Sequence, residues 1–477
     1  MATSPVAKRT RSEESCPSGV PELGVMYPKI LLPEKTKVDL KKWAVVACDQ
    51  YTSEEDYWKR VEEFVGDSPS TLRITFPEVY LDKGKDDEII KGITASMNSY
   101  EASGLFQETE SSGVMVVERT FRNGVMRRGV VLALDLEQYS FKAGSQSLIR
   151  ATEKTIESRI PPRLKVRREV SVELPHIIVL IDDPEDLVLG SLSRHCNDQT
   201  EMYETELMEH SGHIRGFWLT DAEPLMELGT NLRSLADLET FRKKYNLGEE
   251  HVSPLVFAMG DGNHSLATAK SLWEEIKSNA KNIDEVMKSH PARYALVEIQ
   301  NCQDPTLEFE PINRLLLGIK PTAESILGDL RSHFEASGEG PVVIGEGDDI
   351  FNEIASNQFA NSESKKSQSI GYVLNGKRGA ITVSNPKKNI AVATMTDFLD
   401  KWLINHPDVK IDYVHETTAI DRLCVVDHPE NAGFVFSSMN KSDLFKTVIL
   451  DGVLPRKTFS MGASHDKRFY FEGRFIR

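Results

Sequence analysis

The pattern of hydrophobic positions changes period abruptly near the middle of the chain. An apolar run over 254–259 has the length of a buried strand, and the turn Gly260-Asp261-Gly262 follows it at once. Beyond the turn, apolar residues recur at helical spacing at Leu266, Ala269, Trp273 and Ile276. The pattern therefore predicts a strand, a sharp turn and the start of a helix within a few residues.

The same reading of the rest of the chain predicts an α/β fold with mixed sheets. Hairpins are predicted over 114–134 and 370–383, because each contains an Asn-Gly pair, which suits the positive φ angles of a type I′ turn. Periodic apolar positions predict helices over 86–101, 232–247 and 398–404. Shorter apolar runs predict strands over 25–32, 43–47, 72–80, 174–183, 293–299 and 410–415.

The predicted elements fall into three segments. Residues 1–22 carry Lys8-Arg9-Thr10-Arg11 and no apolar pattern, which is typical of a disordered, solvated tail. Residues 23–320 are predicted to form the main α/β core around the strand-turn-helix pattern. Residues 321–477 are predicted to form a smaller C-terminal α/β lobe with a basic loop, and surface loops rich in Gly, Ser, Glu and Asn are expected over 338–369.

Charge and cysteine content narrow the classes of partner. With 477 residues and a net charge of -16, the chain is a poor candidate for general binding to nucleic acid or to an anionic membrane, because phosphate groups favour clustered Lys and Arg. Five scattered cysteines without a Cys-x-x-Cys pair indicate a reducing compartment. Neither a secretory signal nor a membrane-spanning run is present. We therefore expect a cytoplasmic protein with small-molecule partners, and a homo-oligomer is compatible with this.

The predicted turn has the chemistry of an anion site. The first turn of a helix leaves backbone N–H groups without partners and carries partial positive charge, so a glycine turn that feeds a helix can bind phosphate or carboxylate. Asp261 and His264 would stand at the rim of such a pocket. The lysine-containing P-loop pattern is absent, and a tight connection capped by Asn263 or Ser265 explains the same residues equally well.

Other segments offer groups that could complete this site. Seven Lys and Arg residues lie within 148–168, and Arg150 stands out because it follows an apolar pair and would project from the edge of the core. Lys457 and Thr458 suit a phosphate contact. A solvated basic surface is the alternative for both segments. Asp49, with Gln50, ends a predicted strand, where α/β proteins place ligand-binding groups.

Together these segments resemble the family catalogued as domain of unknown function 1015. The resemblance covers nearly the whole chain after the tail, and it implies no settled activity. The segments that carry it are Trp43-Ala44-Val45-Val46-Ala47-Cys48-Asp49-Gln50, Arg150-Ala151-Thr152-Glu153, Arg159-Ile160-Pro161-Pro162-Arg163, 260–270, 454–462 and Lys467-Arg468-Phe469-Tyr470.

More distantly, the segment 261–265 is similar to the D-G-H-H-R motif of proteins with a ParB/sulfiredoxin-like nucleotide-binding fold, among them free-serine kinases that use ADP or ATP. This resemblance implies such a core with large insertions, in which the motif lies against nucleotide phosphates. Asn263 stands where the motif has its first histidine, and Ser265 where it has arginine. Loss of the arginine removes a bidentate phosphate contact, so either Arg150 or Lys457 compensates or the nucleotide role has been lost. The matching positions are Asp261, Gly262 and His264.

The first hypothesis is a phosphoryl-transfer enzyme, a small-molecule kinase acting on free serine or a related hydroxy-metabolite with Mg²⁺ and ADP or ATP. In phosphoryl transfer, most of the rate enhancement comes from positioning, from charge neutralisation and from a carboxylate near the acceptor hydroxyl. A non-catalytic nucleotide- or metabolite-binding protein is the alternative. A phosphohydrolase that uses the same pocket with water as acceptor is the third hypothesis.

The expected roles divide the candidate residues into groups. Asp261 is predicted to bind magnesium or act as the base, and Asp49 is a second candidate base. His264 is predicted to contact phosphate or the transition state, and Gln50 and Thr52 to lie near the acceptor. The predicted phosphate contacts are Gly262, Asn263, Ser265, Arg150, Lys457 and Thr458.

Overall fold

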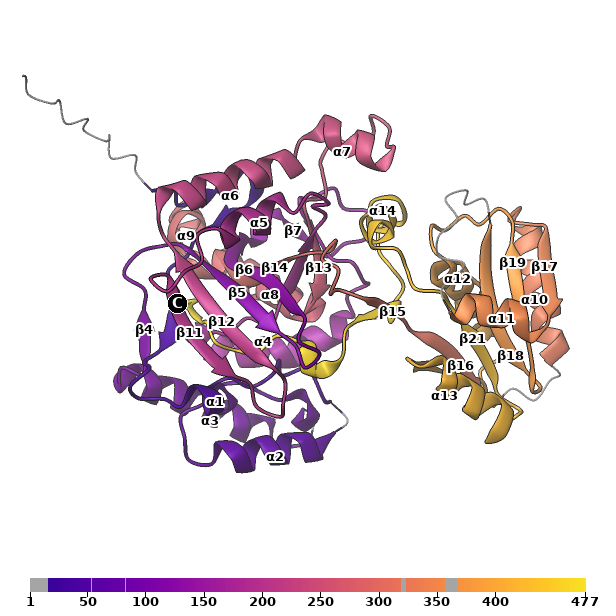
Figure 1. Cartoon of the computed structure of the whole chain (residues 1–477), viewed down its shortest axis with the longest axis horizontal. Coiled ribbons are helices and arrows are strands. Elements are labelled where there is room, and N and C mark those ends of the chain that lie inside the picture. The colour runs from indigo at the N-terminus through magenta and orange to yellow at the C-terminus, as the bar shows by residue number, and fades with distance from the viewer. Residues whose placement is uncertain (1–15, 53, 82, 319–322, 357–366) are drawn as a thin grey trace, which may run out of the picture.

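The computed structural model describes residues 16–52, 54–81, 83–318, 323–356 and 367–477. These residues form two lobes joined by a narrow waist (Figure 1). The larger lobe contains an eleven-stranded mixed sheet and the smaller lobe a six-stranded antiparallel sheet. The predicted α/β fold with mixed sheets is confirmed. None of the described helices is both long enough and apolar enough to cross a membrane.

The main sheet combines antiparallel hairpins with parallel pairs. Its order is β11-β12-β5-β6-β14-β10-β13-β8-β7, with β2 beside β6 and β1 beside β2. The parallel pairs are β10 with β14, β13 with β8, and β7 with β8. The strands are β1 (Gly19–Val20), β2 (Val25–Met26), β5 (Val114–Thr120), β6 (Met126–Asp135), β7 (Tyr139–Ser140), β8 (Ile149–Arg150), β10 (Ile178–Ile181), β11 (Glu201–Glu206), β12 (His213–Leu219), β13 (Phe257–Asp261) and β14 (Tyr294–Asn301).

Helices bury both faces of the main sheet. Alternate residues of a strand point to opposite faces, and in β5 the side chains of Val114 and Val116 join one apolar cluster while Met115 and Val117 join the other. The first cluster includes α5 (Leu187–Ser193), α6 (Ala222–Leu235) and α8 (Asn263–Ser278), with α9 (Ile283–Ser289) at its edge. The second includes α1 (Leu40–Trp43), α2 (Glu55–Val65), α3 (Asp86–Ala102) and α4 (Ile160–Glu169).

The smaller lobe repeats this arrangement. Its sheet has the order β17-β19-β18-β21-β16-β20, and the predicted hairpin over 370–383 is the pair β18 and β19. The strands are β16 (Asn313–Leu317), β17 (Val342–Glu346), β18 (Gln368–Leu374), β19 (Lys377–Val383), β20 (Lys410–Val414) and β21 (Ala432–Val435). One face packs on α10 (Ala323–Ala336) and α12 (Ala391–Ile404), the other on α11 (Asp348–Ala355), α13 (Thr417–Asp421) and the π-helical turn η8 (Arg422–Val426).

Short elements connect the two lobes and complete the larger one. The ribbon of β15 (Phe309–Pro311) and β22 (Phe459–Met461) lies at the waist, near α7 (Leu238–Tyr245) and α14 (Lys441–Asp451). Further two-stranded pairs are β3 (Leu31–Pro33) with β4 (Phe106–Glu108), and β9 (Val172–Glu173) with β23 (Arg474–Phe475). The 3-10 turns are η1 (Pro21–Leu23), η2 (Thr71–Ile74), η3 (Glu78–Tyr80), η4 (Leu136–Gln138), η5 (Glu157–Arg159), η6 (Pro291–Arg293) and η9 (Ser464–Asp466).

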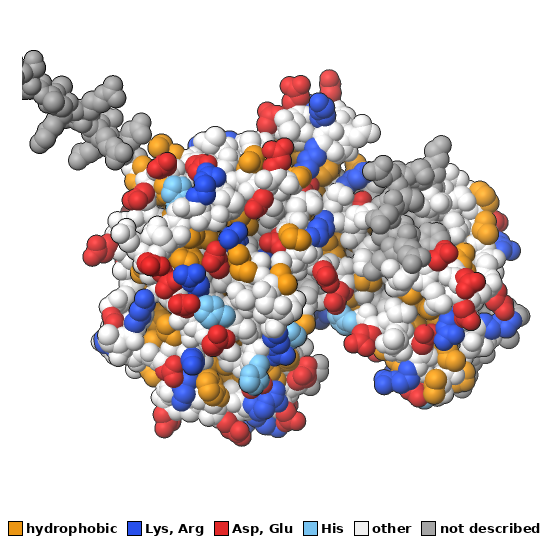
Figure 2. All heavy atoms as spheres, viewed as in Figure 1, with side chains coloured by type: hydrophobic (Ala, Val, Ile, Leu, Met, Phe, Trp, Pro, Cys, Tyr) orange, Lys and Arg blue, Asp and Glu red, His pale blue; other side chains and the backbone are white. Residues whose placement is uncertain are grey.

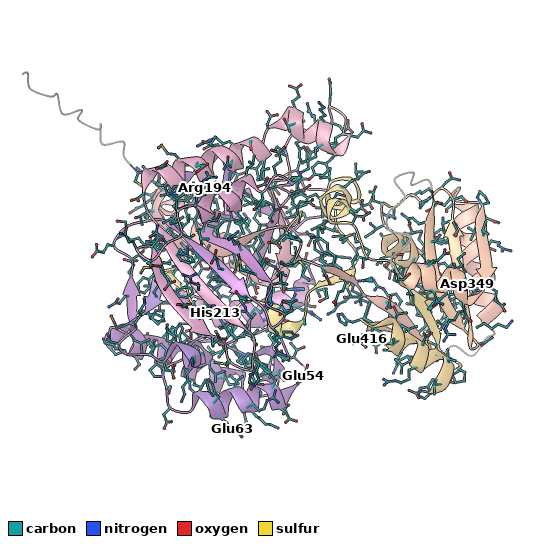
Figure 3. All side chains as sticks on the ribbon, in the orientation of Figure 1. Glu54, Glu63, Arg194, His213, Asp349 and Glu416 are labelled. Atoms are coloured by element: carbon teal, nitrogen blue, oxygen red, sulfur yellow. The ribbon has the colours of Figure 1, made fainter. Side chains whose placement is uncertain are left out.

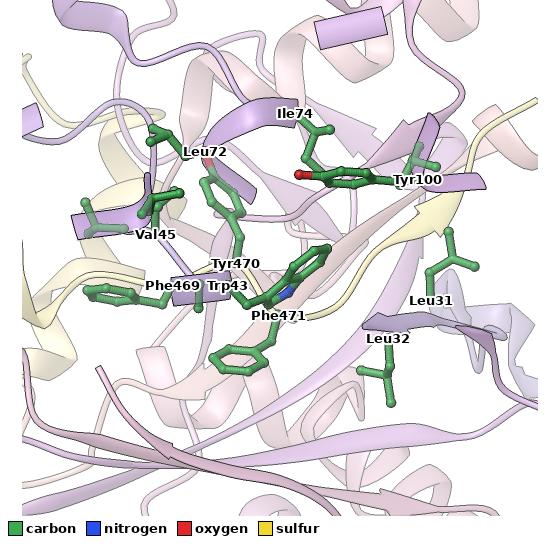
Figure 4. Close-up of a cluster of buried hydrophobic side chains, with 14 of the residues drawn as sticks. Leu31, Leu32, Trp43, Val45, Leu72, Ile74, Tyr100, Phe469, Tyr470 and Phe471 are labelled. Atoms are coloured by element: carbon green, nitrogen blue, oxygen red, sulfur yellow. The ribbon is translucent and has the colours of Figure 1, made fainter. Parts of the chain in front are cut away.

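The C-terminal segment does not stay in the smaller lobe. The sheet of that lobe begins at Asn313 and ends at Val435, whereas the lobe predicted from the sequence covers 321–477. The last residues return to the larger lobe, where Phe469 and Phe471 are buried beside Trp43 (Figure 4). A short aromatic run carries no local sign of its distant partners, so the pattern of hydrophobic positions could not place it.

Several predicted elements differ in the structure. Residues 72–80 lie in η2 and η3 rather than a strand, and Pro77 between them lacks the N–H that a strand ladder requires. In place of the predicted strand over 43–47, Trp43 ends α1 and Val46 forms an isolated bridge with Phe469. Of the predicted tail, residues 1–15 lie outside the described part of the chain, while Gly19–Val20 forms β1. The hairpin over 114–134 and the helix over 86–101 are confirmed.

The buried guanidinium of Arg468 suggests a test of how the C-terminal segment is held. It forms ion pairs with Glu298 of β14 and with Glu472, and its Nε donates to the Pro175 carbonyl at 2.9 Å. Arg468→Leu would leave two buried carboxylates without their cation, so we expect unfolding of the larger lobe to become easier by about 3–5 kcal/mol. The measurement is chemical denaturation followed by tryptophan fluorescence. Arg477→Leu, at the exposed chain end, is the control, and an Arg468→Leu variant as stable as this control would contradict the prediction.

Candidate functional site

The turn between β13 and α8 has the predicted strand-turn-helix form. Asp261 ends β13, Gly262 follows with φ +80°, and α8 starts at Asn263. A Cβ atom at Gly262 would lie 3.1 Å from Ile177 Cα, so both the positive φ angle and the close approach require glycine. Neither Asn263 nor Ser265 caps the helix, since the N-cap position is Gly262, which has no side chain to offer. The Ser265 N–H donates to the Gly262 carbonyl at 3.0 Å. Among the described residues, the N–H groups of Asn263 and His264 have no acceptor and can bind another group.

Parallel pairing places a second strand end beside this turn. In the register of β8 and β13, Ile149 is paired with Phe257 and Arg150 with Ala258. Thr152 extends this pairing beyond the strand, because its Oγ1 donates to the Met259 carbonyl at 2.7 Å. Glu153 thus emerges next to Asp261 at the same edge of the sheet, as expected for two parallel strands that end together.

Most of the predicted site residues line one cavity at this edge, which we call the turn cavity. Its volume is about 720 Å³, within the usual range for small-molecule sites. The predicted residues that line it are Asp49, Gln50, Thr52, Asp261, Gly262, Asn263, His264, Ser265 and Lys457. Predicted residues from three separate parts of the sequence therefore meet at the turn.

Arg150 and Thr458 do not line the turn cavity, which corrects their prediction as phosphate contacts. The Arg150 side chain is buried and donates from Nε to the Ser147 carbonyl at 2.7 Å and from Nη2 to the Ser253 carbonyl at 3.2 Å. Burial lowers its pKa to about 10. Thr458 is also buried, and its Oγ1 donates to the Pro455 carbonyl at 2.6 Å. Both side chains stabilise loops, because they donate hydrogen bonds to backbone carbonyls that would otherwise be buried without a donor.

Asp261 is held as an ion by Lys467. Burial opposes ionisation of Asp261, but the Lys467 ammonium, 2.9 Å from its Oδ2, lowers the pKa of the carboxyl below its ordinary value. The other oxygen, Oδ1, accepts from the Gly262 N–H at 2.8 Å. Each of the two oxygens thus has one partner inside the protein, and the role of magnesium ligand stays a prediction. The part of the chain described here also contains no group of three or more His, Cys, Asp or Glu side chains that could hold a metal ion.

His264 is neutral and its tautomer is defined by its surroundings. Its Nε2 accepts from the Ile156 backbone N–H at 3.3 Å, so Nδ1 carries the proton and is the nitrogen left to donate. Burial, with help from Arg163 and Arg159, lowers its pKa to about 4. His264 can therefore donate a hydrogen bond to an oxygen at neutral pH, but it does not supply a positive charge.

A second histidine, His176, connects Ser265 to the Asp49 side of the cavity. Its Nε2 lies 2.7 Å from Ser265 Oγ and 3.7 Å from Asp49 Oδ2, and its Nδ1 lies 2.9 Å from the Tyr470 hydroxyl. Gln50 Nε2 donates to Asp49 Oδ1 at 3.0 Å. The sequence assigns no role to His176 or Tyr470, because His176 stands in no motif and Tyr470, although part of the segment Lys467-Arg468-Phe469-Tyr470, lies 294 positions away from it.

Three cations line the turn cavity without a carboxylate partner. Among the described residues, Lys154, Arg159 and Lys457 form no ion pair within 4.0 Å, whereas Arg163 is paired with Glu78. Lys154 and Arg159 belong to the same basic segment, 148–168, in which the sequence pattern favours Arg150. Burial raises the pKa of the adjacent Glu153 to about 7, against the opposing effect of Lys457. This side of the cavity therefore carries positive charge, and the Glu153 carboxyl gains or loses its proton near neutral pH.

The turn cavity continues into a larger cavity between the lobes. The inter-lobe cavity has a volume of about 1120 Å³ and shares the side chains Gln50, Glu54, His415 and Lys467 with the turn cavity. Glu54 of the larger lobe and Glu416 of the smaller lobe lie on opposite sides of the gap (Figure 3). The surface around it shows acidic and basic side chains interspersed over both lobes (Figure 2). A ligand in the turn cavity is therefore reached from between the lobes.

Comparison with known proteins identifies a family but no activity. The model of the family described as protein of unknown function DUF1015 matches residues 30–402. No curated protein matches the chain.

Similar solved structures are 9% identical to this chain. They include free serine kinase in complex with AMP and a mutant of free serine kinase in complex with ADP, each with a TM-score of 0.37, covering 72% of this chain and 90% and 91% of theirs. A conserved hypothetical protein from Pyrococcus furiosus has a TM-score of 0.34 and covers 73% of this chain and 95% of its own. TM-scores in this range do not establish a common fold.

The low pKa of His264 has a consequence for stability. Between pH 6.5 and about 4 the unfolded chain binds a proton at this histidine and the folded chain does not, so the stability it contributes is present above pH 6.5 and lost as the pH falls toward 4. In His264→Gln this contribution is gone. We expect the melting temperature of the variant to fall less between pH 7 and pH 5 than that of the wild type, measured by scanning fluorimetry. His428→Gln, at an exposed site, should follow the wild type, and an equal fall in all three proteins would refute the prediction.

Proposed function

The chain belongs to the DUF1015 family, whose function is unknown, and we propose from its own site that it is a phosphoryl-transfer enzyme that binds a nucleotide phosphate at the 261–265 turn. One observation carries the proposal: a helix start without a side-chain cap, and three cations with no ion-pair partner among the described residues, line a single cavity that also holds the carboxylate of Asp49. Such an arrangement stabilises anionic oxygens on one side and can receive a proton on the other.

The phosphate side consists of α8 and the three cations Lys154, Arg159 and Lys457. The first N–H groups of α8 and its dipole favour a bound anion, and the helix is long enough for the dipole to develop. The neutral His264 adds a donor from Nδ1. Arg159 has a planar guanidinium that suits a phosphate, so it takes the place of the motif's arginine, which is Ser265 in this chain.

The acceptor side consists of Asp49, Gln50 and Thr52. Lys467 neutralises Asp261, which leaves Asp49 as the better base of the two candidates. In the proposed step the acceptor hydroxyl oxygen forms a bond to phosphorus, the bond from phosphorus to the nucleotide oxygen breaks, and the hydroxyl proton moves to Asp49. Gln50 holds Asp49 by its amide, and His176 stands 3.7 Å away. The role of each residue is the same for free serine as for a related hydroxy-metabolite.

The proposal predicts that a nucleotide stabilises the folded protein. We expect ADP or ATP to raise the melting temperature, because a ligand that binds only the folded state shifts the unfolding equilibrium. The nucleotides tested also include CTP, and each nucleotide is tested with and without magnesium. In a Lys154→Met, Arg159→Met double variant, affinity for the stabilising nucleotide should fall about tenfold or more, since two charged hydrogen bonds are lost. Lys410→Met, an exposed lysine on the smaller lobe, is the control.

Phosphate transfer separates an enzyme from a binding protein. With the stabilising nucleotide, transfer to free serine or to a panel of hydroxy acids should be measurable, and Asp49→Asn should lower it at least about a hundredfold while nucleotide affinity is kept. Nucleotide hydrolysis without transfer would identify a hydrolase, and binding without either reaction a non-catalytic protein. If no nucleotide stabilises the protein, the proposal fails at its first step.

Glu153 makes phosphate binding depend on pH. Burial raises its pKa to about 7, and a phosphate bound beside Lys457 adds negative charge that raises it further. Binding should therefore take up protons at Glu153, and affinity should fall as the pH rises through 7. Isothermal titration calorimetry in two buffers of different ionisation enthalpy measures this uptake. Since the ligand's own phosphate also titrates, the readout is the difference between wild type and Glu153→Gln, and equal uptake in both proteins would count against the prediction.

A further inference from the structure

A small cavity, which we call the side chamber, adjoins the turn cavity on the acceptor side. Its volume is about 160 Å³. It shares Glu78, Leu81, Arg163 and Ser265 with the turn cavity, so these side chains form a common wall of the two spaces. The side chamber therefore lies next to the place where the acceptor hydroxyl would meet phosphorus.

The walls of the side chamber are mainly apolar. They come from the loop after η2, from α3 and α4, from β9, from the segment before β10, and from β14. The main carbon surfaces are Phe76, Met97, Val166, Val172, Ile177 and Leu296. Val166 is half-buried, and the other five side chains are buried.

The polar groups of the side chamber already have partners inside the protein. Thr268 Oγ1 donates to the His264 carbonyl at 2.7 Å, and Thr75 Oγ1 to the Thr71 carbonyl at 2.8 Å. Arg163 is paired with Glu78, and His176 with Ser265 and Tyr470. An apolar group could thus enter without breaking a hydrogen bond, which is the condition for favourable burial.

One atom of the lining departs from this pattern. Arg167 Nε is buried and has no hydrogen-bond partner among the described residues, although the same guanidinium is paired with Glu173. An acceptor atom on a bound group would satisfy this nitrogen. The chamber therefore tolerates one oxygen on an otherwise apolar group.

We propose that the acceptor substrate carries a compact apolar group, about the size of a phenyl ring, that occupies the side chamber. The inference rests on the proposed function and names its substrate class. A dry cavity of about 150 Å³ binds benzene in another protein, so a volume of about 160 Å³ suits a group of this size. The hydroxyl of such a substrate would point back past Ser265 to Asp49. Free serine would leave the chamber empty.

The test compares acceptor pairs that differ by one phenyl group. L-Serine is compared with threo-3-phenylserine, and L-lactate with L-3-phenyllactate, by isothermal titration calorimetry with and without ADP. We expect each phenyl compound to bind at least about tenfold more tightly than its partner, because a phenyl-sized apolar surface leaves water. Val166→Phe fills the chamber and should abolish this preference while serine affinity is unchanged.

Two further variants keep the result interpretable. Val252→Phe makes the same change at a site that is 67% exposed and outside the lining, and it should keep the preference. Leu174→Phe, at a half-buried wall position, replaces Val166→Phe if that variant does not fold. Phenyl compounds that bind no better than their partners, or a preference that survives filling of the chamber, would overturn the inference.

The same experiment keeps the two proposals apart. Nucleotide binding without a phenyl preference would discard the side chamber as a substrate site and leave the proposed phosphoryl transfer standing. A phenyl preference in a protein that no nucleotide stabilises would keep the chamber as a ligand site and remove the phosphoryl-transfer proposal.

Discussion

The site depends on the burial of one guanidinium. Arg468 lies between Glu298 of the main sheet and Glu472 of its own segment, and it is 5% exposed. A charge removed from water in this way is tolerated only with its partners in place, so the ion pairs define where the C-terminal segment runs. Its sequence neighbours are placed by the same contacts: Lys467 reaches Asp261, and Tyr470 reaches His176. The last residues of the chain thereby set the charge of the turn and the position of the second histidine.

Within the turn cavity, chemically similar side chains differ in protonation state and in hydrogen-bond partners because their surroundings differ. Asp261 ends β13 and Glu153 follows the parallel strand β8, but Asp261 has Lys467 against it and is ionised, while burial raises the pKa of Glu153 to about 7. Of the two histidines, His264 lends its Nε2 to a backbone N–H, and His176 uses both nitrogens on side chains. Such separation of like groups by their surroundings is common where proton transfer and anion binding share one site.

The sequence could predict what depends on local pattern, and it could not predict what depends on distant contacts. The turn at 260–262 and the hairpin at 114–134 are encoded by residues close together, and both are found. Its place after an apolar pair favours Arg150 over Lys154 and Arg159, but the carbonyls of Ser147 and Ser253 accept its hydrogen bonds, and no sequence pattern shows this. The return of Phe469 and Tyr470 to the larger lobe was equally hidden, because their partners lie hundreds of positions away.

The side chamber bears on how the acceptor would be oriented. A serine-sized acceptor offers only its carboxylate, amine and hydroxyl for binding, and these groups lie too close to the reacting atom to be held independently of it. An apolar group anchored among Phe76, Met97 and Leu296 would be bound at a distance from phosphorus. Binding energy from such a remote part of a substrate can hold the hydroxyl in line for attack, which raises the rate of the chemical step rather than affinity alone. The uncapped helix and its cations would then bind the phosphate, while the apolar wall would orient the nucleophile.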